Sequence, residues 1–499
     1  MNKPLPRYWS WILPSVGALF MAVHFGVCTQ DDAFISFRYA ENWANGLGWV
    51  FNPNEYVEGY SNPLWTLLFG VVFLLGGDPV HWSLLFGYGS IIFLTYSTFH
   101  LATTFQISSL WLWLGLLIVA LDPSMVLESV QGLESVFYAG LVPLMVSLAI
   151  RERQDSLSHR WSLVSAILLC LTRPEAPLFV GLLYTGLWLC DRDWRRTLLP
   201  LSIVGLQLAL MTGLRLWYFG DPLPNTFYAK VGGWSGMRGV QYCVAHAKHH
   251  PLMWLGLIGG LFPEKHTPSK HLRLLYWVLL PYLFYVVSIG GDFKPTSRFL
   301  LPMAGLATVL LMFVLQTIKS KHHLWAGGLL SLMFICRLPL FNKAETWALD
   351  RRNNLVARKV VGEWLDQYTP PDTVLAMHSI GVVPFYAQRH TIDMWGLTDR
   401  TIAKTPNEQF GQGMAGHEKT NPDYVFSKHP DLYLPEDGFF QPHKTMQTPE
   451  EGFPNDFTDF YRPISIPIEG SWLNIWVHKR FKEKGGFGEW KKSTNPAPN

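Results

Sequence analysis

Two adjacent carboxylates, Asp31 and Asp32, open a polar segment directly after the first long apolar run of the chain. Two carboxylates this close cannot behave identically, because each negative charge disfavours ionisation of the other. One of them can accept a proton from an attacking hydroxyl group while the other binds an acceptor or a cation. A structural interpretation stays open beside this one, since aspartate is also favoured at the start of a helix, where it caps free N–H groups.

The segment that follows stays polar and bent until the next apolar run begins. Residues 33 to 40 have apolar and aromatic positions that suit a short amphipathic helix at a membrane surface. Farther along, Glu58 and Asn62 stand among glycine and proline residues. So many polar groups at the edge of an apolar run indicate the lining of a cleft.

Further polar islands interrupt the apolar part of the chain, at residues 132–134, 172–175, 219–230 and 290–298. Ionisable groups are costly in an apolar environment and tend to face a cavity. For any single one, a salt bridge at a helix end or a side chain reaching the membrane surface explains it equally well. Their repeated pairing of acid with base favours one shared site. A cavity with cations and aromatic rings suits a lipid phosphate, and the candidate cations are Arg173, Lys230, Lys294 and Arg298.

The composition describes a chain with a membrane-embedded part. Of the 499 residues, 49% are hydrophobic and only 15% are charged, against about 25% charged in soluble domains. A net charge of +3 is too balanced to suggest a nucleic-acid binder. The five cysteines are scattered and form neither a disulfide framework nor a metal site. The sequence contains no glycine-rich nucleotide loop, HExxH, CxxC or GxSxG motif, which leaves nucleotide-dependent, zincin and serine-hydrolase chemistry without support.

Apolar runs without charged residues divide residues 1–342 into about 10 to 12 expected transmembrane helices. The first run, residues 8 to 28, is expected to remain as an anchor, because it ends in bulky residues rather than in a small-residue cleavage site. The later runs lie at 59–77, 79–121, 135–150, 161–172, 176–190, 197–214, 251–263, 274–291, 299–318 and 322–342.

Clusters of basic residues predict which side each loop faces. They occur near the N-terminus and around residues 151–160, 192–196, 265–273 and 319–321, and the positive-inside tendency assigns them to the cytoplasm. The loop at 29–60 and the C-terminal part then face the opposite side. One conflict stays open: three spans between residues 61 and 121 would bring Glu134 to the cytoplasmic side, unless one of them is re-entrant.

After Phe341 charges become frequent and no run of transmembrane length occurs, so residues 343–499 are expected to form an aqueous domain. Residues 373–377 and 391–394 look like two short strands, which indicates a small α/β unit. The glycine-, lysine- and proline-rich end, residues 485–499, is expected to be loose.

These polar segments also carry a family resemblance. The run DDAFISFRYAENWANGLGWVFNPNEYVEGYSNPLW resembles the first extracytoplasmic loop of the GT-C glycosyltransferases related to mycobacterial terminal arabinofuranosyltransferases, a group that also includes flagellar motor control proteins. QGLES, LTRPEAPL, YFGDPLPNTFYAK, GGDFKPTSRFLLP, IDMWGLTDRTIA and GHEKTNPDYV are similar to the same group's pattern, in the same order. The resemblance extends from about residue 31 to 425.

The resemblance implies a polytopic α-helical membrane protein with a C-terminal extracytoplasmic α/β domain, in a bacterial inner membrane, with its site facing the periplasm or exterior. It implies a polyprenyl-phosphate sugar as donor and a cell-envelope glycan as acceptor, with transfer of arabinofuranose or another pentose. By this resemblance Asp31 is the catalytic base and Asp32 its partner, and Arg173, Lys230 and Arg298 hold the donor phosphate. The implied substrate-binding residues are Glu58, Asn62, Glu175, Asp221, Asn225, Tyr228 and Asp292. Two interpretations stay open for His378, Asp393 and His417 of the aqueous domain: they lie over the cleft and bind substrate, or they only hold that domain together.

A single displacement with inversion would follow, with an oxocarbenium-like transition state. No cofactor is certain; a divalent cation could bind Asp31 and Asp32, but two carboxylates do not define such a site. Two departures from the group's pattern, Lys294–Ser297 in place of a glycine-rich turn and Ala176 in place of glycine, leave the sugar open. Two other classes stay open: a lipid-linked-sugar flippase, which predicts an internal repeat that the sequence lacks, and a non-catalytic assembly factor for an envelope or motility complex.

Overall fold

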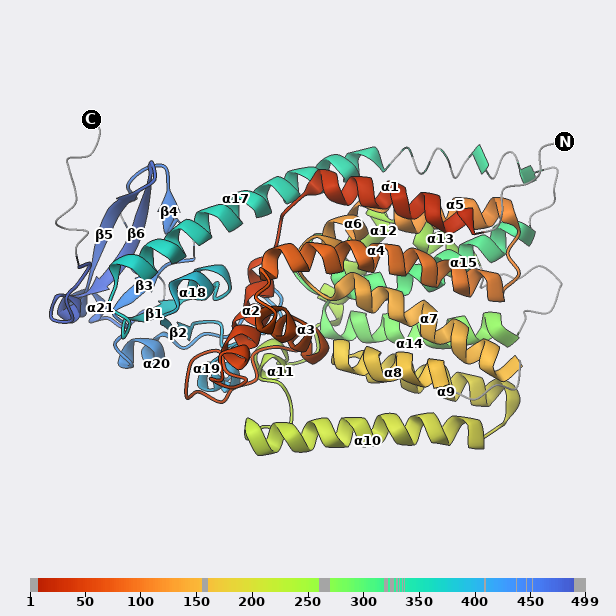
Figure 1. Cartoon of the computed structure of the whole chain (residues 1–499), viewed down its shortest axis with the longest axis horizontal. Coiled ribbons are helices and arrows are strands. Elements are labelled where there is room, and N and C mark those ends of the chain that lie inside the picture. The colour runs from red at the N-terminus through yellow and green to blue at the C-terminus, as the bar shows by residue number, and fades with distance from the viewer. Residues whose placement is uncertain are drawn as a thin grey trace.

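The computed structural model describes residues 8–488 apart from 155–159, 260–269, 318–321, 324–326, 329, 330, 332, 334, 336, 408, 409, 437, 446 and 451. Figure 1 shows a bundle of helices at one end, a small sheet at the other, and the long helix α17 (Leu338–Tyr368) running between them. The predicted boundary at 342/343 falls inside α17, so one continuous helix links the two parts. Part of the predicted run at 322–342 and most of the predicted loose end lie outside the described residues.

The helices follow the predicted apolar runs closely. Before the sheet region the chain forms α1 (Trp9–Phe25), α2 (Asp31–Ala44), α3 (Pro63–Leu74), α4 (Pro79–Thr104), α5 (Ser109–Ala120), α6 (Pro123–Ser129), α7 (Ser135–Gln154), α8 (Arg160–Thr172), α9 (Ala176–Asp191), α10 (Arg195–Tyr218), α11 (Asn225–Lys230), α12 (Gly236–His249), α13 (Pro251–Gly259), α14 (Lys270–Ile289), the 3₁₀ helix η1 (Arg298–Leu300) and α15 (Leu301–Thr317).

Five of these helices, counting η1 and α15 as one, are long and apolar enough to cross a membrane: α4, α7, α10, α14 and η1–α15. Helices α5 and α6, which meet at an angle of 53°, add a sixth if they form one broken span. Four more apolar helices, α1, α3, α8 and α9, have 10 to 17 residues. The described residues therefore hold fewer full-length spans than the 10 to 12 expected, because several apolar runs form helices shorter than the roughly 20 residues that a bilayer requires.

The short helix α3 removes the conflict over Glu134. With 12 residues it is about 18 Å long, which is too short to cross a hydrocarbon core of about 30 Å. It packs beside α2 at one end of the bundle, and α4 then runs away from that end while α5 and α6 return to it (Figure 1). The segment with Glu134 therefore lies at the same end as Asp32.

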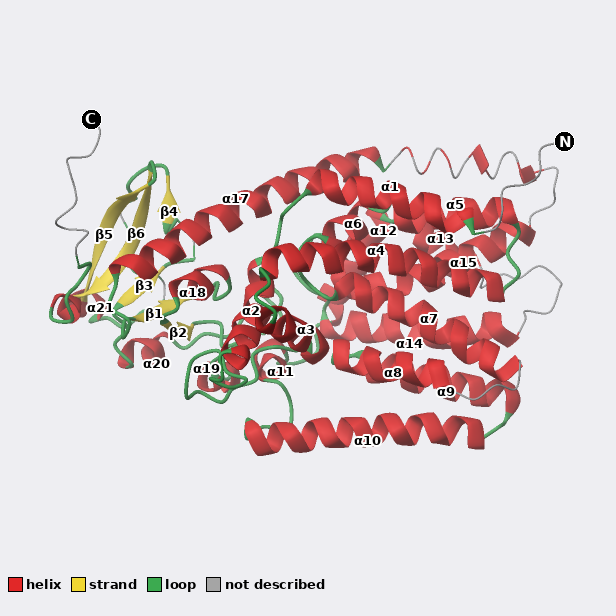
Figure 2. Ribbon diagram, viewed as in Figure 1, coloured by secondary structure: helices red, strands yellow, loops and turns green. Residues whose placement is uncertain are grey.

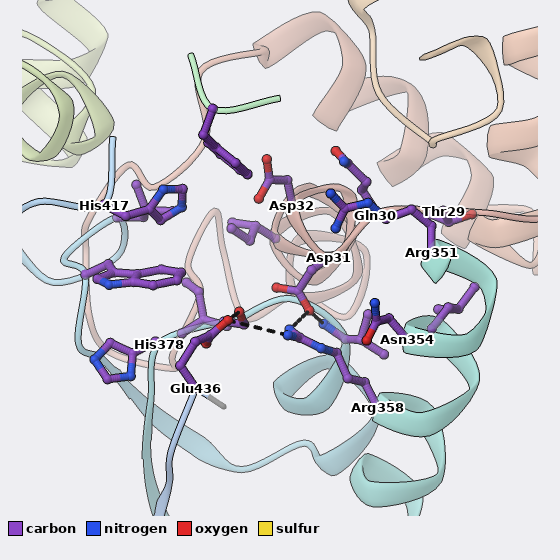
Figure 3. A pocket seen from close by; sticks show the side chains of 18 of the residues that line it. Thr29, Gln30, Asp31, Asp32, Arg351, Asn354, Arg358, His378, His417 and Glu436 are labelled. Atoms are coloured by element: carbon purple, nitrogen blue, oxygen red, sulfur yellow. Dashed lines mark hydrogen bonds and ion pairs between the residues drawn. The ribbon is translucent and has the colours of Figure 1, made fainter. Parts of the chain in front are cut away.

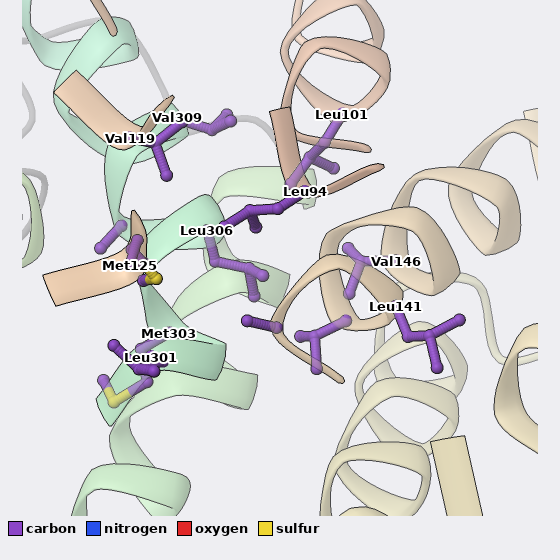
Figure 4. Close-up of a cluster of buried hydrophobic side chains, with 14 of the residues drawn as sticks. Leu94, Leu101, Val119, Met125, Leu141, Val146, Leu301, Met303, Leu306 and Val309 are labelled. Carbon is purple, nitrogen blue, oxygen red and sulfur yellow. The ribbon is translucent and has the colours of Figure 1, made fainter. Parts of the chain in front are cut away.

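Close packing between α4, α5, α6, α7 and α15 forms the core of the bundle. Leu94, Val119, Val146 and Leu306 belong to it and are almost completely buried (Figure 4). Gly87 of α4 lets α6 come very close, since a Cβ atom there would lie 1.7 Å from the carbonyl oxygen of Ser129. Small residues at helix contacts allow this approach in apolar bundles.

A buried ionic cluster joins α6 to the start of α17. The carboxylate of Asp122, which caps α6, lies 2.7 Å from the Arg337 guanidinium and 2.9 Å from Nδ1 of His250. All three side chains are at least nine-tenths buried. Because these side chains are removed from water, breaking their contacts would leave a buried charge without a partner. The cluster therefore fixes the position of the start of α17 relative to α6.

The C-terminal part is a six-stranded mixed sheet, yellow in Figure 2. Its order is β2-β1-β3-β6-β4, with β5 on β6. The strands β1 (Val374–Met377) and β2 (His390–Asp393) match the two predicted from sequence and pair in parallel, with Leu375 opposite Thr391. The other elements are α18 (Val382–Ala387), α19 (Arg400–Lys404), α20 (Pro422–Ser427), β3 (Leu432–Leu434), β4 (Phe440–Gln441), α21 (Phe457–Phe460), β5 (Tyr461–Ile468), β6 (Ser471–His478) and η3 (Lys479–Lys482).

Arg38 holds α2 between the bundle and the sheet. Its buried guanidinium donates hydrogen bonds to the carbonyl oxygens of Phe51 at 2.8 Å, Pro384 at 2.5 Å and Arg389 at 2.8 Å. An arginine with this many fixed acceptors joins the three segments rigidly. The start of α2 is thereby held at the junction of the two parts.

Candidate functional site

The carboxylate of Asp31 is held by hydrogen bonds from the sheet domain and by an ion pair with α17. It accepts hydrogen bonds from the backbone N–H groups of Gly381 at 2.8 Å and Val382 at 2.9 Å, and it pairs with Arg358 at 3.0 Å (Figure 3). Gly381 allows the contact, because a Cβ atom there would lie 1.8 Å from the Asp31 carbonyl oxygen. Asp31 thus caps α18 across the domain junction as well as starting α2.

The neighbouring carboxylate, Asp32, points to a different set of groups. Nζ of Lys294 lies 3.3 Å from its Oδ2, and a guanidinium nitrogen of Arg298 lies 3.9 Å from the same atom. Burial raises the pKa of Asp32, but Lys294, Lys230 and Arg298 outweigh this effect and hold that pKa well below its usual range. Asp32 is therefore ionised at neutral pH.

Two chambers meet at Asp32. The larger has a volume of about 340 Å³ and is lined by bundle helices and their loops, and the smaller has about 150 Å³ and is lined mainly by α17 and the sheet domain. Asp32, Ile35, Phe293, Leu397 and His417 line both chambers, whereas Asp31 lines only the smaller one. Asp32 is thus the carboxylate that can touch molecules on both sides.

Two predicted polar islands and the polar segment with Asn62 meet in the wall of the larger chamber. The Arg173 guanidinium is held between Glu134 at 2.7 Å and Glu175 at 2.6 Å, and the Asn62 amide donates to Glu134 at 2.6 Å. Because two carboxylates already neutralise Arg173, this group forms a rigid ionic wall rather than a free cation.

The cations opposite this wall differ in their partners. Arg298 pairs with Asp292 at 3.0 Å, and Lys294 donates to Gln30 besides approaching Asp32. Lys230 is exposed to the larger chamber, and no carboxylate of the described residues lies within 4.0 Å of its Nζ. Burial among other groups and the charges of Arg298 and Lys294 lower the pKa of Lys230 to about 8, although Asp32 acts in the opposite direction. Lys230 is the cation that an incoming anion can reach.

The smaller chamber combines an ionic wall with aromatic rings. Arg358 lies 3.0 Å from Asp31 and 3.6 Å from Glu436, whose oxygens also accept from Ser379. The Trp395 ring contacts the imidazoles of His417 and His378, with centroid distances of 4.1 and 5.2 Å. Burial lowers the pKa of His417 to about 4, so its imidazole is neutral at pH 7.

Five residues predicted to bind substrate line neither chamber and have protein partners instead. Glu58 pairs with Arg215 at 2.7 Å, Asp221 with Arg400 and Lys404, and the ring of Tyr228 lies under Lys404. Asn225 and Asp393 organise the loop at 394–399, the first by donating to three of its carbonyl groups and the second by accepting from Trp395 and Thr398 N–H. Burial raises the pKa of Asp393 to about 7. The predicted residues that do line a chamber are Asp31, Asp32, Asn62, Arg173, Glu175, Lys230, Asp292, Arg298, His378 and His417.

Several chamber residues were absent from the predicted site. Glu134 lay in a recognised polar island, whereas Arg351 and Arg358 looked like ordinary charges of an aqueous domain. Their spacing of seven residues, which puts both on one helix face, was the available signal. Within the described part of the chain, no group of three or more His, Cys, Asp or Glu side chains is arranged to hold a metal ion.

Comparisons with known proteins agree with this architecture. Residues 347–476 match a family model described as a domain of unknown function (DUF8728). Terminal beta-(1->2)-arabinofuranosyltransferases from Mycobacterium tuberculosis and Corynebacterium glutamicum are 27% and 26% identical over 244 and 336 residues, which cover 46% and 55% of this chain. The matches span 39% and 46% of those relatives, less than half of each.

Two crystal structures of ArnT from Cupriavidus metallidurans match almost the whole chain. The form bound to undecaprenyl phosphate has a TM-score of 0.55 at 11% identity and covers 94% of this chain and 98% of ArnT. The apo form has a TM-score of 0.53 at 13% identity, with coverage of 93% and 97%. The protein has the GT-C fold. At such low identity the likeness establishes the fold alone, and the sequence relatives add the resemblance to arabinofuranosyltransferases.

Proposed function

We propose that the protein is an inverting glycosyltransferase that moves a sugar from a polyprenyl-phosphate donor to a glycan acceptor. One observation carries the proposal: an ionised carboxylate, Asp32, lines both chambers, and in the larger one Lys230 has no carboxylate partner among the described residues. A base between a donor chamber and an acceptor chamber is what a single displacement requires.

The larger chamber suits the donor. Lys230 and Arg298 line it and can bind phosphate oxygens, and Tyr285 and Ile289 of α14 extend its lining toward the apolar bundle. The buried Lys294, whose Nζ lies 3.3 Å from Asp32, adds positive charge nearby. This arrangement fits a phosphate head with an isoprenoid tail. The undecaprenyl phosphate bound to ArnT, which shares the fold, supports a lipid of this class.

The base in this proposal is Asp32, which replaces Asp31 in the role expected from sequence. All the contacts that hold Asp31 come from the sheet domain and Arg358, and both of its oxygens already accept hydrogen bonds. Without a donor, the positive charges of Lys294 and Arg298 act on Asp32, and a bound phosphate would offset part of that charge. Donor binding therefore reduces the positive field on Asp32, which raises its pKa and makes it a stronger base at the moment of transfer.

The reaction then proceeds as one balanced step. Asp32 takes the proton of an acceptor hydroxyl, the hydroxyl oxygen bonds to the anomeric carbon, and the bond from that carbon to the phosphate oxygen breaks. The polyprenyl phosphate leaves with its negative charge, which Lys230, Lys294 and Arg298 stabilise. Attack from the face opposite the phosphate inverts the anomeric configuration. The related arabinofuranosyltransferases favour a pentose as the sugar.

The site would face the side of the membrane away from the cytoplasm. Helix α7 starts next to Glu134 in the larger chamber and ends with Arg151 and Arg153 in its last turn. Its 20 residues span about 30 Å, so the basic residues lie at the opposite membrane face from the chambers. Since such residues favour the cytoplasmic side, an inner membrane with an outward-facing site fits best.

Transfer by the purified protein in lipid nanodiscs tests the proposal. Polyprenyl-phosphoryl arabinofuranose, and then other lipid-linked pentoses and hexoses, are supplied with oligosaccharide acceptors, and products are detected by mass spectrometry. Wild-type protein and Asp423→Asn, a change at an exposed residue far from the chambers, should form product, and Asp32→Asn should not. Absence of transfer with every donor from folded wild-type protein would reject the transferase and favour the flippase or assembly-factor alternatives.

A further inference from the structure

The smaller chamber also holds a cation, Arg351, that has no carboxylate partner in the described part of the chain. Arg351, Asn354 and Arg358 occupy one face of α17 and line that chamber together. Figure 3 shows the Arg351 side chain extending from α17 into the chamber, on the side where Gln30 and Asp32 lie. Arg358 is neutralised by Asp31 and Glu436. For Arg351, in contrast, no carboxylate within 4.0 Å is found among the residues that the structure describes.

The acidic residues that line this chamber interact with cations other than Arg351. Asp31 and Glu436 share Arg358, and Asp32 faces Lys294. The Arg351 guanidinium therefore has no counter-ion of its own among the described residues, in a chamber that also holds the hydroxyl and amide groups of Thr29, Gln30 and Asn354. A neutral ligand would leave the half-buried guanidinium without a counter-charge once it displaced the water, which costs free energy, whereas an anion would supply two oxygens to the guanidinium fork.

Lys230 and Arg351, neither of which has a carboxylate partner among the described residues, line different chambers that meet at Asp32, Lys230 the larger and Arg351 the smaller. In the proposed function the donor phosphate occupies Lys230, so Arg351 remains for the other substrate. Across the same chamber, the Trp395 ring lies with His378 and His417 (Figure 3) and offers a flat apolar surface to a sugar ring.

We propose that the smaller chamber binds an acidic acceptor, a saccharide carrying a carboxylate or phosphate group that pairs with Arg351 while a hydroxyl of the same ligand reaches Asp32. The assignment of this ligand as the acceptor rests on the proposed function. It names the substrate class, which neither the fold nor the sequence relatives specify. Arg351 is then a specificity-determining residue, and it takes no part in proton transfer.

Binding in the absence of donor tests the inference, because no transfer can occur. Isothermal titration calorimetry on the full-length protein in nanodiscs compares three probes: trigalacturonic acid, galactotriose, and galactotriose 6-phosphate. The variants are Arg351→Gln, Arg351→Lys and the control Arg352→Gln. Arg352 is the adjacent residue, but its guanidinium donates to the Phe25 carbonyl oxygen at 2.6 Å and lines neither chamber.

Wild-type protein should bind at least one acidic probe about tenfold or more tightly than galactotriose, and Arg351→Gln should remove that preference without weakening the neutral probe. Arg351→Lys should retain part of the preference, and Arg352→Gln all of it. The acidic probe that binds more tightly identifies carboxylate or phosphate as the group. Equal binding of the neutral and acidic probes by wild-type protein, or equal losses in Arg351→Gln and Arg352→Gln, would overturn the inference.

The transfer assay separates this inference from the proposed function. Preferential binding of an acidic probe without transfer from any lipid-linked sugar would keep the anion-binding role of Arg351 and reject the transferase. Efficient transfer to neutral acceptors with no effect of Arg351→Gln would keep the transferase and reject the acidic acceptor.

Discussion

The two chambers that meet at Asp32 are built in different ways. The larger is lined by helix ends and loops of the bundle, and most of its charged residues come from polar islands inside an apolar sequence. The smaller is lined by α17 and the sheet domain, where charged residues are common and none stands out. A polar residue is informative only against an apolar background, so the sequence reveals one chamber and hides the other. Three differences can be tested: Asp32 serves both chambers, Lys230 serves only the larger one, and Asp31 holds the sheet domain in place and does not take the proton.

Asp32→Asn should have the largest effect, because it removes the one carboxylate that both chambers share. We expect kcat to fall roughly a thousandfold, within the range that general bases contribute, while KM for donor and acceptor changes little. Steady-state kinetics with a fixed lipid-linked donor measure this. A large rise in either KM with unchanged kcat would assign Asp32 to binding in one chamber only.

Glu134→Gln should strongly destabilise the larger chamber. It removes one of the two carboxylates that pair with the buried Arg173 and leaves Glu175 as its partner, so the loss is that of a charged hydrogen bond, about 2 kcal/mol. Unfolding followed by tryptophan fluorescence gives the change. Glu363→Gln is the matched control, because Glu363 pairs with Lys359 on an exposed helix face at 3.6 Å, where such pairs contribute about 0.5 kcal/mol or less. Similar losses in both variants would contradict the ionic wall.

Lys230 should set the alkaline limit of donor binding. Only the protonated amine attracts phosphate, and its pKa is lowered to about 8, so kcat/KM for the donor should fall as pH rises through about 8. Lys230→Arg should remove this alkaline limb, since arginine stays charged, and Lys230→Met should raise donor KM about tenfold at pH 7 without changing acceptor KM. An unchanged limb in Lys230→Arg would assign the titration to another group.

Asp31→Asn should have the smallest effect on activity. An asparagine keeps one oxygen to accept from Gly381 or Val382 but loses the charge that faces Arg358. We expect less than about a tenfold loss of kcat, together with faster hydrogen exchange at the start of α18. Hydrogen exchange with mass spectrometry and the transfer assay report these separately. A loss of kcat as large as that of Asp32→Asn would return the base to Asp31.

Much of the bundle could be predicted from the sequence, because apolar runs of a given length leave few alternatives to helices. The two strands at 374–377 and 390–393 were also predicted almost to the residue. Fewer full-length spans are found among the described residues than the run lengths predict, because run length does not reveal that α3 is short and packs on α2. Glu58, Asp221 and Asn225 were expected in the pocket, but partners distant in sequence, Arg215, Arg400 and the loop at 396–399, hold them in the walls.

The sequence alone determined that polar islands would gather at one end of an apolar bundle, since ionisable groups there must find partners or a cavity. It also determined that Asp31 and Asp32 would begin a helix. Only the tertiary structure decided which of them faces both chambers. Successive residues of a helix point about 100° apart, so two neighbours in sequence enter different surroundings. The packing of α18 and α17 against one side of α2, and of the loop with Lys294 against the other, gave these two carboxylates different roles.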